Sequence, residues 1–240
     1  MVAMNLLSTH NLSRKFGGIT AVDNISFVIP TGQVRALIGP NGAGKTTFVS
    51  MLSGRIAATE GQVFFDGIDV TKEPAHLRIR AGMAYTFQIT SIYGRLSVFE
   101  NVALAVRWQT SGDENETKRR VEDALAEVGI SDRATQLAGD LSYGHQRLLE
   151  IAMGLCQKPK LLILDEPTQG LADSEINQFI RLISNLRGVM TILLIEHNID
   201  VVMRSADAIT VLNNGKVLAE GSPKEIHENA AVQAAYLGTS

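Results

Sequence analysis

Short runs of apolar residues alternate along the chain with segments whose apolar positions recur every three or four residues. Three runs, Val34–Ile38, 161–164 and Thr191–Ile195, are almost entirely apolar. Strands of this kind are typical of a parallel sheet that is covered on both faces. Val34–Ile38 leads through GPNGAG into KTTFVSMLSG, where Phe48, Met51 and Leu52 share one helical face. The pattern therefore predicts an α/β fold.

Two further segments predict antiparallel hairpins. ITVL and KVLAEG flank Asn213-Asn214-Gly215, and VFFDGIDV (63–70) is centred on Asp66-Gly67. Asn-Gly and Asp-Gly pairs tolerate the positive φ of a tight hairpin turn.

Helical periodicity dominates from about residue 97 to residue 157. It appears in VFENVALAVRW, KRRVEDALAEVG and GHQRLLEIAMGL, and the polar stretch TSGDENET (110–117) between the first two predicts a solvated loop. A helical insertion therefore interrupts the sheet. We expect one domain spanning 1–240, with a core formed by 1–88 and 158–240 and a helical subdomain at 89–157.

Composition narrows the class of protein. The 240 residues are 45% hydrophobic and 20% charged, which is typical of a soluble globular protein, and the net charge of −3 does not suggest a nucleic-acid binder. The single cysteine, Cys156, cannot form an internal disulfide, so a reducing cytosol fits best. No segment resembles a signal peptide or approaches the ~18 apolar residues of a membrane span.

The stretch GPNGAGKT (39–46) matches the phosphate-loop motif G-x-x-x-x-G-K-[ST] in full. Glycines let backbone N–H groups turn toward an anion, and the following helix adds its positive end. Lysine can reach the β- and γ-phosphates, and the threonine hydroxyl can ligate Mg²⁺. We therefore expect a nucleoside triphosphate site formed by Gly39, Pro40, Asn41, Gly42, Ala43, Gly44, Lys45, Thr46 and Thr47.

An acidic pair follows the second apolar run. Asp165 at the end of that strand can hold Mg²⁺, and Glu166 can orient and polarise an attacking water. His197 ends the third run, so it is expected at the same sheet edge, where it can assist Glu166. Such a pair can also be a solvated turn, and a histidine at a strand end is often structural. The upstream phosphate loop favours the catalytic interpretation.

Together these motifs resemble the nucleotide-binding subunits of ABC transporters. GPNGAGKTT, the glutamine of YTFQ, LSYGHQ, LLILDEPTQGL and LLIEH occur in that family's order and span essentially the whole chain. The resemblance implies a P-loop NTPase, RecA-like core with an N-terminal antiparallel β-layer and an inserted helical subdomain. It implies ATP hydrolysis with ATP and Mg²⁺ as cofactors.

The resemblance also assigns roles to single residues. Phe16 in RKFGG matches the aromatic residue that stacks on adenine, although a core or surface phenylalanine is the alternative. Gln88 matches the glutamine that approaches Mg²⁺ and the water, at the junction with the helical subdomain. Thr46, Gln88 and Asp165 are therefore the expected metal site, and Glu166, His197 and Gln88 the expected catalytic residues.

The segment LSYGHQ (141–146) departs from the family pattern LSGGQ. In the family this segment faces the γ-phosphate bound to a second subunit, so Ser142 and Gly144 are expected to contact ATP in trans. Tyr143 and His145 replace a glycine and a glutamine, and a positive φ at Tyr143 would be costly. Ser142 is also a capable helix N-cap. A core-facing stripe follows it: Leu148, Ile151, Ala152 and Leu155.

A second departure follows the acidic pair. Where the family often has an aspartate after TxGL, this chain has Ala172, with Asp173 next. Neither residue is assigned that role.

Finer features resemble importer ATPases of the branched-chain amino-acid class: RKFGGITAVD, GMAYTFQ, LLIEHNIDVVM and AAYLG. ATPases for urea, amides and lipopolysaccharide export share them. The expected partners are a second copy or a related ATPase subunit, membrane permease subunits and, indirectly, a solute-binding protein, with no nucleic acid. The expected location is peripheral, on the cytoplasmic face of the inner membrane.

Three alternatives remain. One is a soluble ABC-type ATPase in DNA repair, translation or cluster assembly, although the chain has neither a long coiled-coil insertion nor two fused halves. Another is a P-loop kinase or nucleotide switch. The third is a non-catalytic regulatory subunit, against which Lys45, Asp165, Glu166 and His197 argue.

Overall fold

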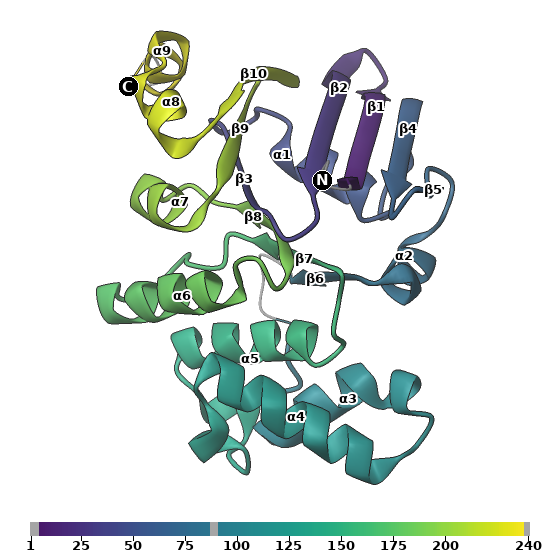
Figure 1. Ribbon diagram of the computed structural model, residues 1–240, viewed down its shortest axis with the longest axis vertical. Helices are drawn as coiled ribbons and strands as arrows, with labels where there is room; N and C mark the ends of the chain where they lie inside the picture. Colours follow the sequence, from purple (N-terminus) through teal and green to yellow (C-terminus); the bar gives the residue numbers. More distant parts are fainter. Residues whose placement is uncertain (1–4, 87–90, 238–240) are drawn as a thin grey trace.

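The computed structural model describes residues 5–86 and 91–237, which form two sheets (Figure 1). One is antiparallel, in the order β2-β1-β4-β5. The other has the order β10-β9-β3-β8-β7-β6 and is parallel except for the β9–β10 pair. The strands are β1 (Asn5–Phe16), β2 (Ile19–Pro30), β3 (Val34–Ile38), β4 (Glu60–Phe65), β5 (Ile68–Asp69), β6 (Met83–Thr86), β7 (Leu161–Asp165), β8 (Thr191–Ile195), β9 (Ala208–Asn213) and β10 (Lys216–Gly221).

The helices form two groups around the parallel sheet. The helices α3, α4 and α5 lie together at the end of the molecule away from the antiparallel sheet, and α7, α8 and α9 lie along one side (Figure 1). None of the helices in the described residues is long and apolar enough to cross a membrane. The helices are α1 (Lys45–Leu52), α2 (Ala75–Ala81), α3 (Val98–Thr110), α4 (Glu114–Val128), α5 (Tyr143–Leu155), α6 (Asp173–Leu186), α7 (Ile199–Ser205), α8 (Pro223–Glu228) and α9 (Ala230–Leu237), with 3-10 turns at Ser131–Arg133 and Ala138–Asp140.

Both faces of the parallel sheet are covered, as the apolar strands predicted. Successive side chains of a strand point to opposite faces. In β7, Leu161 and Ile163 pack with α1 and the antiparallel sheet, whereas Leu162 and Leu164 pack with the helices α3 to α6. The helix α1 thus lies between the two sheets, and its Phe48 ring meets the Phe27 ring of β2 edge-on at 5.4 Å.

The predicted hairpins are confirmed. The strands β9 and β10 pair across Asn214 and Gly215, which have φ values of 48° and 76°. The strands β4 and β5 pair across Asp66 and Gly67, with φ values of 51° and 78°. Both turns need positive φ at two successive residues, which Asn-Gly and Asp-Gly supply at low cost.

The solvated loop predicted at 110–117 is confirmed only at residues 111–113, an exposed turn between α3 and α4, and its two ends are helical. Thr110 ends α3, Thr117 lies inside α4, and the two buried hydroxyls hydrogen-bond at 2.7 Å. Asp113 starts α4 by accepting hydrogen bonds from the backbone N–H groups of Asn115 and Glu116. A good N-cap outweighs the polar composition of this stretch. The limits 89–157 for the helical subdomain stay a prediction, and its start lies outside the described residues.

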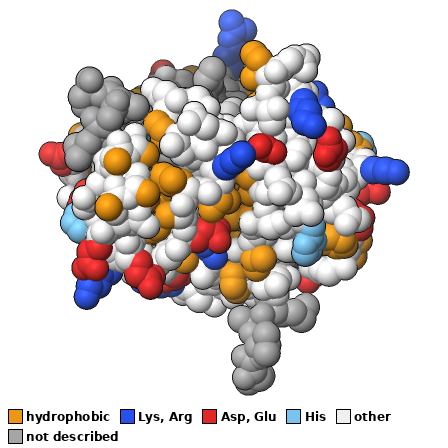
Figure 2. Space-filling view, turned by 90° about the horizontal axis from the view of Figure 1, so that it is seen from above, with side chains coloured by type: hydrophobic (Ala, Val, Ile, Leu, Met, Phe, Trp, Pro, Cys, Tyr) orange, Lys and Arg blue, Asp and Glu red, His pale blue; other side chains and the backbone are white. Residues whose placement is uncertain are grey.

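The C-terminal helices carry an apolar hollow. In the view from above, hydrophobic side chains gather on the left, on the side of α8 and α9, while basic and acidic side chains are interspersed elsewhere (Figure 2). A pocket of about 250 Å³ lies between α7, α8 and α9. Its apolar lining includes Ile199, Val202, Met203, Ile226 and Val232.

Candidate functional site

The phosphate loop connects β3 to α1. Ile38 ends the strand and Lys45 begins the helix. Gly44 has φ 98°, and a Cβ there would lie 2.5 Å from the carbonyl oxygen of Ala21. Only glycine combines this left-handed backbone with so close an approach of the β1–β2 hairpin. The second glycine of the motif therefore lets the antiparallel sheet sit against the loop.

Lys45 holds the loop in shape from inside. Lys45 is 7% exposed, and its Nζ donates to the carbonyl oxygens of Gly39 at 2.6 Å and Pro40 at 3.1 Å. Burial lowers the pKa of Lys45, while the negative charges of Glu166 and Asp165 oppose that shift. Among the described residues, the ammonium is bonded only to neutral carbonyls, so a phosphate can replace them as a stronger acceptor.

An open cleft of about 530 Å³ lies over the loop. It brings residues 41–47 together with Glu166 and His197, as the motifs predicted. It also includes residues to which the sequence analysis gave no role in binding: Ile19, Thr20, Ala21, Asn214 and Gly215. The cleft therefore has a wall from the β1–β2 hairpin and another from the β9–β10 turn.

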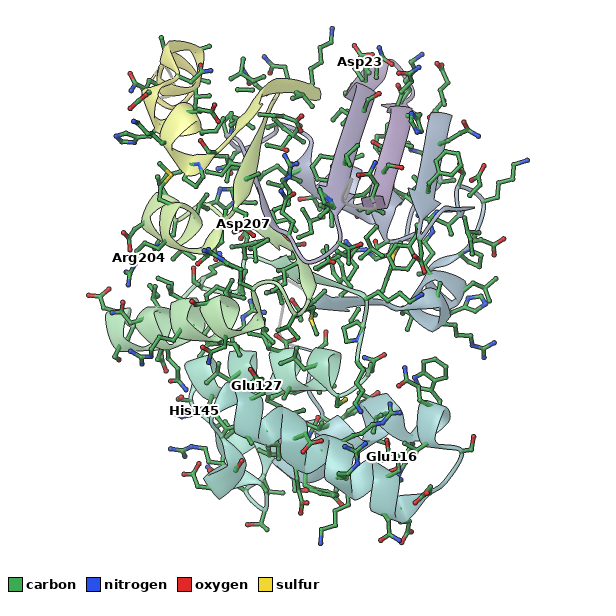
Figure 3. All side chains as sticks on the ribbon, viewed as in Figure 1. Asp23, Glu116, Glu127, His145, Arg204 and Asp207 are labelled. Atoms are coloured by element: carbon green, nitrogen blue, oxygen red, sulfur yellow. The ribbon has the colours of Figure 1, made fainter. Side chains whose placement is uncertain are left out.

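Hydrogen bonds and an ion pair join these walls. Gly215 donates from its N–H to Ala43 O at 3.0 Å and accepts from Asp23 N–H at 2.8 Å. The Asp23 carboxylate, labelled in Figure 3, pairs with Lys216 at 3.1 Å. The Asn-Gly signal predicted the turn, but nothing local in the sequence indicated that it reaches the phosphate loop.

Glu166 and His197 meet at the edge of the cleft. The parallel register pairs Asp165 of β7 with Ile195 of β8, so the residues that follow both strands emerge side by side. His197 Nε2 lies 2.6 Å from Glu166 Oε1. Glu166 has φ 50°, a left-handed backbone that is uncommon for a residue other than glycine.

Asp165 lies deeper than its neighbour. The Tyr85 hydroxyl donates to Asp165 Oδ2, and Arg55 donates to that hydroxyl at 2.7 Å. Burial raises the pKa of Asp165, and the nearby Glu166 charge adds to the rise, while Tyr85 and Arg55 oppose it. Burial and the bond to Asp165 also raise the pKa of Tyr85. In the sequence, the only indication of a role for Tyr85 is its position in β6, three residues before Gln88.

The donor set fits Mg²⁺. Thr46 lines the cleft and carries a hydroxyl group, and the buried Asp165 supplies one carboxylate. Mg²⁺ commonly binds one or two carboxylates together with substrate phosphates. In the described part of the chain, no group of three or more histidine, cysteine or acidic side chains could hold a metal ion by itself. Gln88, the third expected ligand, lies outside the described residues.

Phe16 is exposed at the end of β1, so it is not a core residue. Phe16 is 45% exposed, and the Arg14 guanidinium lies 4.5 Å from the centroid of its ring. Phe16 does not line the cleft, although Ile19, its cross-strand partner, does. The adenine-stacking role stays a prediction.

The LSYGHQ segment forms the start of α5. Ser142 is the N-cap, and its Oγ accepts from His145 N–H at 3.3 Å. Tyr143 has no positive φ; its ring lies against Gly170 in the β7–α6 loop. Figure 3 shows His145 at one end of α5, and neither Ser142 nor Gly144 lines the cleft. The predicted stripe Leu148, Ile151, Ala152 and Leu155 is buried.

Family models match two parts of the chain. Residues 22–169 match the model described as ABC transporter. Residues 216–240 match the model described as branched-chain amino acid ATP-binding cassette transporter.

Curated relatives align over nearly full length. The high-affinity branched-chain amino acid transport ATP-binding protein BraF of Pseudomonas aeruginosa is 36% identical and covers 97% of this chain and 98% of its own. The probable branched-chain amino acid transport ATP-binding protein LivG of Archaeoglobus fulgidus is also 36% identical, over 98% and 96%. The lipopolysaccharide export system ATP-binding protein LptB of Haemophilus influenzae is 29% identical, over 98% of both chains.

Solved structures agree with the fold. An ATP-binding cassette of an ABC transporter in its ADP conformation superposes with a TM-score of 0.88 at 28% identity, covering 98% of this chain and 99% of that one. This structural match, the family models and the cleft over the phosphate loop all indicate an ATP-binding cassette. The chain therefore belongs to the ABC transporter family, as one of its ATP-binding, ATP-hydrolysing subunits.

Proposed function

We propose that the chain powers the import of branched-chain amino acids. Support comes from the match of residues 216–240 to the branched-chain amino acid model and from relatives named for that transport at 36% identity. A relative named for lipopolysaccharide export is 29% identical, so an exporter ATPase is the second candidate. A soluble ABC-type ATPase outside transport is the remaining alternative.

One observation carries the hydrolytic part of the proposal: the contact of Glu166 with His197 beside the phosphate loop. In the proposed reaction, Glu166 accepts a hydrogen bond from water and turns it toward the γ-phosphate. His197 holds that carboxylate in place. Lys45 moves its hydrogen bonds from the loop carbonyls to the phosphates, and the backbone N–H groups of the loop add to the cradle.

The same proposal includes Mg²⁺, held by Thr46, Asp165 and Gln88. When bound, Mg²⁺ supplies positive charge that neutralises the β- and γ-phosphate oxygens. Asp165 suits this role because Tyr85 occupies one of its oxygens and fixes the orientation of the other.

The proposed assembly is a head-to-tail pair with a second copy or a related subunit. Ser142 and Gly144 at the N-terminus of α5 then face the γ-phosphate in the partner's cleft. Membrane permease subunits, fed by a solute-binding protein, convert closure of the pair into transport, with this chain peripheral on the cytoplasmic face.

The catalytic proposal is tested by Glu166→Gln. The amide keeps the shape of Glu166 but is a poorer acceptor for water, so we expect kcat to fall by on the order of 10² or more with ATP still bound. Turnover is measured by phosphate release. Glu127→Gln, on the exposed side of α4 and labelled in Figure 3, is the matched control and should behave as wild type. Undiminished turnover in Glu166→Gln would remove Glu166 from catalysis.

The same variant tests the pair. Light scattering on a sizing column measures the mass of Glu166→Gln with and without ATP. We expect a monomer without ATP and a dimer with it. The uncleaved γ-phosphate in each cleft should keep the LSYGHQ segment of the other copy bound. A persistent monomer would mean that a different subunit, and not a second copy of this chain, supplies the segment that faces the γ-phosphate.

The substrate class is tested in a complex reconstituted with permease subunits and a solute-binding protein of the branched-chain amino-acid class. Leucine-loaded binding protein should raise ATP turnover, and vesicles should accumulate leucine. Stimulation by lipopolysaccharide instead would favour the exporter candidate.

A further inference from the structure

Glu196, between β8 and His197, is a buried carboxylate that the proposed reaction does not use. The residue is 3% exposed. Its Oε1 accepts hydrogen bonds from Thr168 N–H at 3.0 Å and Thr168 Oγ1–H at 2.6 Å. Its Oε2 accepts from the backbone N–H groups of His197 at 3.0 Å and Asn198 at 3.2 Å. Four donors thus surround one carboxylate, which matches its acceptor capacity.

These bonds connect two loops that are far apart in sequence. Thr168 lies in the loop after β7, close behind Glu166, and His197 and Asn198 lie in the loop after β8. The carboxylate of Glu196 therefore ties together the two loops that carry the Glu166–His197 contact.

The backbone conformation of Glu166 needs support of this kind. Glu166 has φ 50°, and such a conformation in a non-glycine residue persists only where its surroundings hold it. Glu166 N–H donates to Ile195 O at 2.9 Å, which anchors the residue on one side. The bonds from Thr168 to Glu196 anchor the other side. Without them, the loop after β7 loses its tie to Glu196 and keeps the bond to Ile195 and its internal turn bond, Gln169 N–H to Glu166 O at 3.2 Å.

We propose that Glu196 is a positioning residue for ATP hydrolysis. Its carboxylate keeps the loops after β7 and β8 in register, so that Glu166 stays within 2.6 Å of His197 and faces the cleft. Glu196 does not line the cleft, so it acts through Glu166 and His197 rather than on the nucleotide. The inference rests on the proposed roles of Glu166 and His197.

A glutamine cannot replace Glu196. The amide group has one acceptor oxygen and one NH₂ donor. If its oxygen faces Thr168, the NH₂ group meets the N–H groups of His197 and Asn198. If the amide flips, the NH₂ group meets the Thr168 N–H instead. One of the two loops is therefore released in either orientation, although the side chain keeps its size.

The test is Glu196→Gln in the purified full chain. We expect kcat to fall on the order of 10², because a misplacement of about 1 Å in a catalytic group has that effect. The affinity for a fluorescent ATP analogue should be unchanged, since the phosphate loop is untouched. Amide hydrogen exchange should speed up at Thr168, His197 and Asn198, and not in β3 or β7.

Two further variants control the experiment. Thr191→Val removes a part-buried hydrogen bond, Gly32 N–H to Thr191 Oγ1 at 2.9 Å, at the end of β8 opposite to Glu196. It should lower the melting temperature without changing kcat. Thr168→Val removes one of the four donors and should lower kcat less than Glu196→Gln does. Thr168→Ser keeps that donor and should restore the wild-type rate.

The outcomes separate the inference from the proposed function. Wild-type kcat in Glu196→Gln, or a kcat loss that Thr191→Val reproduces, would overturn the positioning role. So would a parallel loss of ATP affinity. If Glu196→Gln does not fold, unchanged kcat in Thr168→Val overturns it instead. Glu166→Gln runs in the same assay: if that variant keeps full activity, the proposed catalytic roles fail first.

Discussion

Asp165 ends β7 with its carboxylate turned into the protein, where the residue is 7% exposed. Burial disfavours its charged form, and Glu166 adds repulsion, so its pKa lies above the usual range. Tyr85 compensates in part by donating to Oδ2. The charged form of Asp165, which the proposed Mg²⁺ site requires, is therefore the form that burial disfavours.

This leads to a prediction for stability. A carboxyl group whose folded pKa is raised favours the folded state below its unfolded pKa, and that contribution is lost as pH rises through the folded pKa. Asp165→Asn should therefore raise the melting temperature at neutral pH, on the scale of roughly 2–4 °C for each kcal/mol at this chain length. The gain should shrink as pH falls through the raised pKa of Asp165. Melting curves across the acidic range measure it.

The same variant should lose Mg²⁺-dependent ATP turnover, which separates function from stability. Asparagine keeps an acceptor for the Tyr85 hydroxyl, so packing is preserved. A lower melting temperature in Asp165→Asn at neutral pH would mean that the bonds from Tyr85 and Arg55 outweigh the cost of burial.

At the scale of elements, the start of α5 fits closely against the start of α6. A Cβ at Gly144 would overlap the Glu175 carboxylate, whose Oε2 accepts from Ala172 N–H at 2.9 Å. One residue earlier, the Tyr143 ring lies against Gly170, and its hydroxyl accepts from Arg147 at 2.9 Å. The tyrosine in the signature is therefore accommodated by the loop that precedes α6.

Gly144→Ala tests this fit. The added methyl group displaces the Glu175 carboxylate from the Ala172 N–H group, so we expect a loss of about 1 kcal/mol or less in the free energy of unfolding. Removing the obstacle should restore part of it: in Gly144→Ala with Glu175→Ala, the loss should be smaller than the sum of the single losses. Denaturant titration measures both. Strict additivity would show that the two residues do not touch.

The loop predicted at 110–117 shows where composition misleads. Eight polar or small residues predict a solvated loop, yet Asp113 caps α4, and Arg120 pairs with Glu116 at 2.7 Å within that helix. The capping residue is visible in the sequence. Its effect is not, because the Thr110–Thr117 contact that buries this corner forms only once α3 and α4 pack.

At the scale of the whole molecule, the cleft is assembled from distant parts of the chain. The β1–β2 hairpin, the phosphate loop, the loops after β7 and β8, and the β9–β10 turn all line it. A ligand that binds them at once stabilises the native state relative to the unfolded chain.

We therefore expect ATP with Mg²⁺ to raise the melting temperature of Glu166→Gln, in which ATP is not consumed. At a hundredfold excess over Kd the gain is about 2.7 kcal/mol, or roughly 5–10 °C for a chain of this length. Adding Lys45→Ala should abolish the shift, because the cleft then lacks its buried cation. Differential scanning fluorimetry gives the comparison. A shift that survives Lys45→Ala would place the nucleotide elsewhere.

The sequence alone determined the features that depend on neighbouring residues. Gly44 and Lys45 make a phosphate loop because backbone freedom and charge are needed at adjacent positions. Asn214-Gly215 makes a turn because both residues tolerate positive φ, and the apolar runs of β3, β7 and β8 predict a covered sheet. Local chemistry and periodicity are readable without any knowledge of neighbours in space.

Only the tertiary structure decided which residues support that chemistry. Glu196 bonds to Thr168, Tyr85 bonds to Asp165, and the Tyr143 ring lies against Gly170 in the loop before α6. Two of these contacts cross neighbouring strands in a sheet whose order, β3-β8-β7-β6, does not follow the order of the chain. A buried polar side chain finds its partner through that strand order and register, because its neighbours in space are supplied by other strands and helices rather than by adjacent residues.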